Sequence, residues 1–160
     1  MSNTAVDSSV GDEVIQLVTF RLKDETYGIN VMQVQEVLRV TEIAPVPGAP
    51  QYVLGIINLR GNVVTVIDTR TRFGLPTTDL DDASRIVIIE SEDQVVGILV
   101  DSVAEVVELR HSEIDSAPNI GNEESARYIQ GVTSRDEDLL IVVDLNKLLT
   151  EEEWSEMTMF

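Results

Sequence analysis

The chain has 160 residues, which suits one domain or two closely packed subdomains. Its 29 acidic and 11 basic residues give a net charge of −18, which disfavours nucleic acids and anionic membrane surfaces as partners. The absence of cysteine excludes disulfides, thiolate nucleophiles and cysteine metal sites, and no apolar run suits a membrane span or signal peptide. We therefore expect a soluble, cytoplasmic protein.

The first segments predict a tail, two strands and a short helix. Residues 1–13 are polar and rich in Ser and Asp, and we expect them to form a disordered tail. The run LVTFRL alternates as a half-buried strand does, and TYGI predicts a second strand. The next run, NVMQVQEVLR, carries valines at helical spacing after Asn30, a candidate N-cap, and predicts a short helix near residues 30–39.

The remaining segments add strands and one further helix. The proline-rich IAPVPGAPQ predicts an irregular connection, and YVLGIIN and VVTVID predict a hairpin in which Gly61 supplies a positive φ. Strands are also predicted in RIVIIE, QVVGILV, YIQGVT and LLIVVD. Thr150 and Glu153 have capping-box spacing, so LNKLLTEEEWSEM predicts a C-terminal helix.

The two halves of the chain resemble each other. Residues 17–37 match residues 86–106 at an offset of 69, and this block aligns Gly28 with Gly97. At an offset of 76, the clearest matches are Tyr52 with Tyr128, Gly55 with Gly131, and Asp68 with Asp144. Glycine and tyrosine matches in register are harder to reach by chance than apolar ones. We therefore predict an internal duplication and an all-β fold of two packed barrels, one in about residues 14–81 and one in about 82–160.

No motif for catalysis or metal binding is found in the sequence. The one histidine, His111, lies in the polar stretch ELRHSEID, and the phosphate loop, dinucleotide turn, GxSxG motif and paired metal-ligand histidines are absent. Neighbouring carboxylates such as Asp81 and Asp82 are expected from composition alone. We therefore predict a binding module that is not an enzyme and has no cofactor or metal.

The two copies differ at the tip of one hairpin. Arg60 in the first copy corresponds to Asp136 in the second, so the matching hairpins present opposite charges. Arg60 is either an ordinary exposed arginine of a turn or an anchor for a partner, since arginine is enriched among the residues that dominate binding energy. Glu36 has the same two interpretations, a solvated charge or a contact.

Three segments together resemble the CheW family of chemotaxis coupling proteins. The first is TYGINVMQVQEVLRVTEIAPVPGAPQYVLGIINLRGNVVTVIDTRTRFGL. QVVGILVDSVAEVVEL and YIQGVTSRDEDLLIVVDLNKLL are similar to that family's second half, and the resemblance covers about residues 14–150. It implies two five-stranded SH3-like barrels that bind the cytoplasmic tips of chemoreceptors and the CheW-like regulatory domain of the histidine kinase CheA.

The resemblance also implies which residues make these contacts. Receptor binding would involve five residues: Val34, Glu36, Val37, Asn58 and Arg60. Kinase and ring contacts would involve four: Val103, Val106, Asp115 and Ile120. Asp115 and Ile120 stand where some members carry Arg and Phe. The family also implies a protein that is monomeric when isolated, joins rings within receptor arrays, and reaches the membrane only through its partners.

Two alternatives remain at this point. One is a CheW-like scaffold for a receptor array that does not control motility. The other is a barrel that binds or hydrolyses a small ligand at its acidic surface, which predicts saturable binding or turnover of a small molecule.

Overall fold

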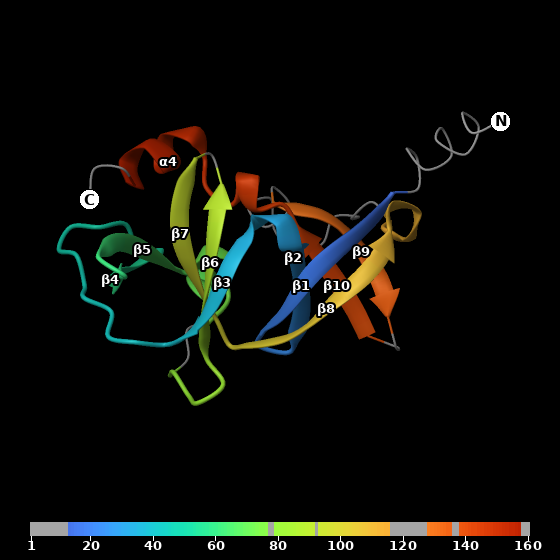
Figure 1. Cartoon of the computed structure of the whole chain (residues 1–160), viewed down its shortest axis with the longest axis horizontal. Coiled ribbons are helices and arrows are strands. Elements are labelled where there is room, and N and C mark those ends of the chain that lie inside the picture. Colours follow the sequence, from blue (N-terminus) through green and yellow to red (C-terminus); the bar gives the residue numbers. More distant parts are fainter. Residues whose placement is uncertain (1–12, 77–78, 92, 116–127, 136–137, 158–160) are drawn as a thin grey trace.

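The computed structural model describes residues 13–76, 79–91, 93–115, 128–135 and 138–157, and it consists mainly of two five-stranded sheets (Figure 1). The first sheet has the order β8-β1-β2-β10-β9 and the strands β1 (Val14–Leu22), β2 (Glu25–Asn30), β8 (Ser102–Arg110), β9 (Ile129–Arg135) and β10 (Asp138–Val143). The second has the order β3-β6-β7-β5-β4 and the strands β3 (Val34–Arg39), β4 (Val53–Leu59), β5 (Asn62–Asp68), β6 (Arg85–Ser91) and β7 (Gln94–Val100). The all-β prediction with five strands in each unit is confirmed. The predicted tail at residues 1–13 lies, apart from Glu13, outside the described residues.

The duplicated copies exchange strands with each other. In each sheet, the first two strands of one copy pair with the last three strands of the other: β1 and β2 join β8–β10, while β6 and β7 join β3–β5. The predicted division near residue 81 is therefore wrong as a boundary between the sheets. The chain passes between them after β2 and again after β7, so neither half of the sequence contains a complete sheet.

The strand pairings repeat in the two sheets at the offsets that relate the copies. Val142 pairs with Gly28 in the first sheet, and the equivalent residues Val66 and Gly97 pair in the second. The isolated bridges repeat as well, with Ala44 opposite Ile56 and Asp115 opposite Val132. The same register in both sheets explains why these matches survive in the sequence.

The matched residues Asp68 and Asp144 lie at the end of the last strand of each copy, and both cap the helical turn that follows. Asp68 caps α2 (Thr69–Arg72) by accepting from the backbone N–H of Thr71 at 3.3 Å. Asp144 accepts from the N–H of Asn146 at 3.0 Å and caps a 3₁₀ turn, Leu145–Lys147. A short acidic side chain suits this position because its oxygen satisfies a backbone donor that the helix leaves free.

The helix predicted near residues 30–39 is wrong. Asn30 does cap a single 3₁₀ turn, Val31–Gln33, by accepting from the N–H of Met32, but the chain then becomes β3. Valine is a weak helix former and packs well on a pleated surface, and pairing with β6 decides the outcome. The helical spacing of the valines has another origin, because the β3–β6 register shifts between Val34 and Glu36 and brings Val34 and Val37 to the same face.

The C-terminal helix is confirmed as α4 (Glu151–Met157). The predicted capping box forms, since the Thr150 N–H donates to Glu153 Oε1 at 2.8 Å and the Glu153 N–H donates to Thr150 Oγ1 at 3.1 Å. Trp154 is 4% exposed and anchors the helix to the main core. None of the helices in the described ranges has the length and apolar character needed to cross a bilayer.

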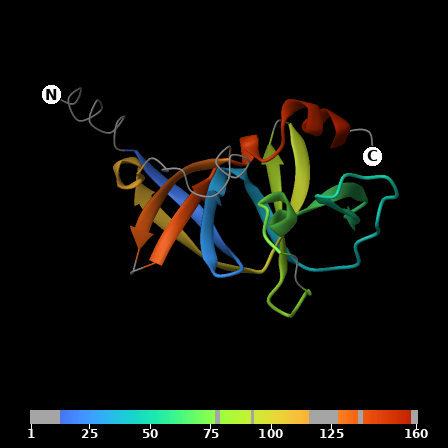
Figure 2. The ribbon, with the colours of Figure 1, turned by 180° about the vertical axis from the view of Figure 1, so that it is seen from behind.

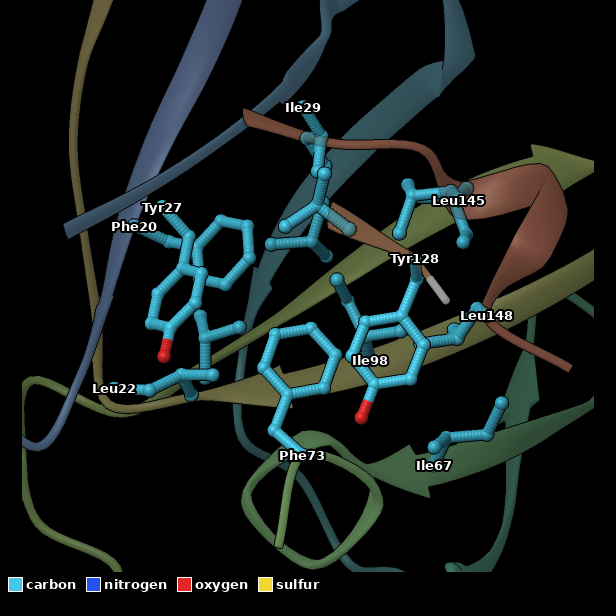
Figure 3. Packing of buried hydrophobic residues seen from close by; sticks show 14 of the residues in the cluster. Phe20, Leu22, Tyr27, Ile29, Ile67, Phe73, Ile98, Tyr128, Leu145 and Leu148 are labelled. Carbon is cyan, nitrogen blue, oxygen red and sulfur yellow. The ribbon is translucent and has the colours of Figure 1, made fainter. Parts of the chain in front are cut away.

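The buried side chains form three groups, one in each sheet and one between the sheets. One lies on one face of the first sheet and consists of Leu17, Val107, Leu109, Leu140 and Val142. Its counterpart on the second sheet consists of Ile57, Val64, Val66, Ile86 and Ile88. The third and largest draws on both sheets, on Phe73 directly after α2 and on the C-terminal segment, and it forms the junction between the sheets (Figure 3). The two sheets thus share most of their core.

A row of aromatic rings crosses this junction (Figure 3). Phe20 stacks on Tyr27 at 5.7 Å between ring centroids, Tyr27 lies 5.2 Å from Phe73, and Phe73 stacks on Tyr128 at 4.6 Å. Phe73 directly follows α2 and thus inserts a residue of the second sheet's connection between rings from the first. Burial, with smaller contributions from Glu25 and Tyr128, raises the pKa of Tyr27 to about 12.

Tyr27→Phe is expected to reduce the loss of folding stability that occurs as the pH rises into the alkaline range. The unfolded phenol has a pKa of 10.0 and the folded one about 12, so the folded state binds the proton more tightly over this interval. The contribution of Tyr27 is complete below pH 10 and is lost as the pH rises through 12. Urea unfolding between pH 8 and pH 11 measures the change, and an equally steep loss in Tyr27→Phe would contradict it.

Thr69→Val is expected to raise the free energy of unfolding by about 1 kcal/mol. Thr69 is 1% exposed, and its hydroxyl has no hydrogen-bond partner among the described residues. Replacing the hydroxyl with a methyl group keeps the shape and removes a buried polar atom. Thr19→Val is the matched control with the opposite sign, because Thr19 Oγ1 donates to the Glu105 carbonyl oxygen at 2.8 Å and accepts from its N–H at 3.0 Å. Chemical denaturation of both variants checks the pair.

Candidate partner-binding surfaces

The β4–β5 turn presents Arg60 at its tip. Arg60 and Gly61 both have positive φ, 51° and 89°, as a two-residue hairpin turn requires. The predicted positive φ at Gly61 is confirmed, whereas the one at Arg60 was not predicted. The Gly61 N–H donates to Asn58 Oδ1 at 2.8 Å, so Asn58 fixes the turn from the strand that enters it. The three residues form one local unit that fixes the backbone from which the Arg60 side chain extends.

Arg60 forms a bidentate ion pair with Glu36, and this pair connects opposite edges of the second sheet. Arg60 Nη1 donates to Glu36 Oε1 at 3.2 Å, and Nη2 donates to Oε2. Glu36 belongs to β3 and Arg60 follows β4, the two edge strands, so the sheet must curl to bring them together. The hydrogen bond from Arg60 lowers the pKa of Glu36. The Arg60 side chain is 69% exposed and remains accessible to a partner.

The two predicted receptor valines lie on the face of β3 opposite to Glu36. Val34 and Val37 stand beside Ile89 and Val87 of β6, which belong to the junction core. Glu36 stands beside Ile88, which belongs to the second sheet's own core. Val34 is half-buried against the junction, while Val37 is 41% exposed. The structure thus places all five predicted receptor residues on β3 and the β4–β5 hairpin, with direct contact between Glu36 and Arg60.

The predicted kinase-binding residues lie on the first sheet. Val103 and Val106 of β8 stand beside Phe20 and Val18 of β1, and both of those belong to the junction core. Val103 packs against that core, whereas Val106 is 55% exposed.

The other two predicted kinase residues belong to the segment that follows β8. The exposed Asp115 exchanges backbone hydrogen bonds of 2.8 and 2.9 Å with Val132 of β9. Ile120 lies outside the described residues. Three of the four predicted kinase residues are therefore placed on the first sheet, and none of them on β3 or the β4–β5 hairpin.

Exposed apolar side chains occur at equivalent positions of the two copies. Val37 corresponds to Val106, and Val63, which is 64% exposed, corresponds to Leu139, which is 42% exposed. Val63 pairs directly with Asn58, and both line a depression beside the hairpin. Val63 and Leu139 are candidate contacts that the sequence analysis missed. An apolar residue at the second position of the second strand in both hairpins was the available signal.

The described residues contain no group of three or more potential metal ligands. His111 is exposed and begins a 3₁₀ turn, His111–Glu113, and its N–H donates to the carbonyl oxygen of Glu13 at 2.8 Å. The arrangement offers surfaces for protein contacts: an ion pair, exposed valines and edge strands.

Comparison with known proteins identifies the family. The CheW-like domain family matches residues 16–153. The chain is 38% identical over 152 residues to a chemotaxis protein CheW of Treponema pallidum, covering 92% of this chain and 89% of that protein. It is 35% identical over 137 residues to CheW of Bacillus subtilis, covering 86% and 88%. The crystal structure of the scaffolding protein TtCheW from Thermoanaerobacter tengcongensis superposes with a TM-score of 0.77 at 33% identity, covering 84% and 91%. The chain belongs to the CheW family.

Proposed function

We propose that this chain is a chemotaxis adaptor that couples chemoreceptors to the histidine kinase CheA without catalysing a reaction. The relatives are named chemotaxis proteins, and the solved neighbour is called a scaffolding protein. One observation carries the proposal. The candidate receptor residues are all on the second sheet, and the described candidate kinase residues are all on the first. A single molecule can therefore hold both partners at once.

The receptor surface suits an amphipathic helix. Val63 supplies apolar area beside the hairpin, and Val37 supplies it on the face of the edge strand β3 opposite to Glu36. The Arg60–Glu36 pair supplies two charges in a fixed geometry. A helix docks into such a surface by burying its apolar face, while the charges set its register and orientation. Because Arg60 is already held by Glu36 and by the turn, little side-chain freedom is lost on binding.

The kinase surface would use Val103, Val106 and the segment around Asp115, with Ile120 as a further proposed contact. Holding receptor and kinase on one scaffold raises their effective concentration and lets receptor conformation bias kinase activity. The adaptor would work in the cytoplasm and reach the membrane through the receptor. It would be monomeric in isolation and able to join rings in an array.

The proposal is tested by mixing the purified chain with a receptor cytoplasmic fragment, with CheA, and with both. We expect binding to each partner and strong stimulation of CheA autophosphorylation only in the mixture of three. A folded chain that binds neither partner, or that binds both without changing kinase activity, would contradict the coupling role.

A further inference from the structure

The short helix α2 carries two arginines that have no counterpart in the second copy. At the offset of 76, Arg70 and Arg72 correspond to Asn146 and Leu148. The helix follows β5 of the second sheet and lies at the junction of the two sheets, where it appears as a small green turn in Figure 2. Arg70 reaches the crossover from β7 to β8, and Arg72 reaches the C-terminal segment that follows β10.

Arg70 holds the crossover from β7 to β8. Asp101 is the single residue between these strands, and it receives Arg70 Nε on Oδ1 at 2.8 Å and Arg70 Nη2 on Oδ2. The same carboxylate accepts from the backbone N–H of Lys23, in the β1–β2 turn of the first sheet, at 2.8 Å. Asp101 also donates its own N–H to the Arg21 carbonyl oxygen at 3.0 Å. One carboxylate therefore ties α2 to a turn of the opposite sheet.

Arg72 holds the C-terminal segment that follows β10 of the first sheet. Its Nη1 and Nη2 donate to the two oxygens of Glu153 at 2.9 and 2.7 Å, and its Nε donates to the Leu148 carbonyl oxygen at 2.8 Å. The Tyr128 hydroxyl donates to the Arg72 carbonyl oxygen at 2.8 Å. The guanidinium also lies 5.1 Å from the centre of the Tyr52 ring. Five contacts therefore converge on one residue.

Both ion pairs are shielded from water. The side chains of Arg70 and Asp101 are 14% and 26% exposed, and those of Arg72 and Glu153 are 11% and 22% exposed. Two parallel hydrogen bonds from a planar guanidinium constrain orientation as well as distance. Apolar packing in the junction core is non-directional and leaves small rotations between packed layers open. The two pairs supply the directional constraint that packing lacks.

We propose that Arg70 and Arg72 are positioning residues that fix the orientation of the two sheets and, with it, the relative placement of the two partner surfaces. The placement of the two partner surfaces rests on the proposed coupling function, whereas the orientation of the two sheets does not. Neither arginine is among the residues assigned to a partner contact. Their loss should therefore leave each separate binding step intact and weaken the step that needs both surfaces in a fixed relation.

The orientation is measured on the full-length chain with two spin labels. The native sequence has no cysteine, so Glu90→Cys on β6 and Gln130→Cys on β9, both exposed, label one site on each sheet. We expect a narrow distance distribution in the otherwise unchanged chain and at least a twofold broader one after Arg70→Met with Arg72→Met. Arg85→Met is the matched control. Its hydrogen bonds go to the carbonyl oxygens of Asp82 and Ser84 in its own connection, so the width should not change.

Arg70→Lys and Arg72→Lys keep the charges without the paired hydrogen bonds. If the methionine variant does not fold, this lysine variant carries the test with the same expected broadening. An unchanged width in a folded variant would overturn the positioning role.

The functional consequence is measured with a receptor cytoplasmic fragment and CheA. We expect the affinity for each partner alone to stay within about twofold, while kinase stimulation in the mixture of three falls about tenfold. A purely structural role would instead lower both affinities together with stability. Unchanged stimulation despite a broadened distribution would refute the link to coupling. If the unaltered chain binds neither partner, the proposed function fails, and the label widths still decide whether the arginines orient the sheets.

Discussion

Arg60→Glu is expected to weaken binding of a receptor cytoplasmic fragment tenfold or more. The substitution removes the guanidinium that the β4–β5 turn holds at the candidate surface. It also places a second carboxylate beside Glu36, where the two like charges repel. On a chain with a net charge of −18, the loss of a cation at the binding site also removes local attraction for an acidic partner. Titration calorimetry with the receptor fragment measures the change.

Arg39→Glu separates a site effect from a general charge effect. Arg39 is exposed at the end of β3 and changes the net charge by the same amount, yet it makes no contact with Glu36. We expect its affinity to fall less than twofold at physiological salt, because exposed charges more than a Debye length apart are largely screened. Equal losses in both variants would assign the effect to net charge. Unchanged affinity in a correctly folded Arg60→Glu protein would remove Arg60 from the surface.

Self-comparison of the sequence could predict the duplication but not the exchange of strands. Matches such as Gly28 with Gly97 arise because both glycines occupy the same place in two sheets of equal register. Such matches do not show which copy supplies the neighbouring strand in a sheet, because equivalent strands have equivalent pairing surfaces. In the structure the chain changes sheets at the short crossovers after β2 and β7.

The members of the candidate receptor site come from the family resemblance, and the sequence could not predict how they are arranged in space. The resemblance placed Glu36 and Arg60 in one set, but they are separated in the chain and lie on opposite edges of the sheet. Only the curl of the second sheet brings them into contact. The error at residues 30–39 has the same origin. A register shift in β3 mimics helical spacing, and a shift of this kind depends on the partner strand.

The sequence alone assigns no role to Arg70 and Arg72. Their partners Asp101 and Glu153 lie on other elements, and acidic residues are too numerous in this chain for such pairings to be chosen from composition. Long-range ion pairs of this kind become visible only when the topology is known.

Gly55→Ala is expected to lower the free energy of unfolding by about 3 kcal/mol, because the added methyl group has no space. A Cβ at Gly55 would overlap the carbonyl oxygen of Ala44, and backbone atoms cannot move aside as a flexible side chain can. Ala44 and Ile56 exchange backbone hydrogen bonds of 2.9 and 2.8 Å at this point, so relief of the clash breaks the bridge that covers β4. For a protein of this size, the loss lowers the melting temperature by roughly 10 °C.

The other glycines of the duplication provide a graded series for the same measurement. At Gly131, the equivalent position, a Cβ would lie 2.6 Å from the Asp115 carbonyl oxygen, and we expect a loss close to that of Gly55→Ala. At Gly28 the nearest atom is the end of the Leu17 side chain at 3.1 Å, and we expect a loss below about 1 kcal/mol because Leu17 can shift. Thermal unfolding of the three alanine variants gives the order. A loss at Gly28 as large as that at Gly55 would show that glycine is needed there for its backbone freedom and not for the close approach of two chains. A small loss of stability at both Gly55 and Gly131 would mean that the segments bridged to β4 and β9 separate from these strands at little cost in free energy. Those segments, around Ala44 and Asp115, lie at the edge of the two candidate surfaces.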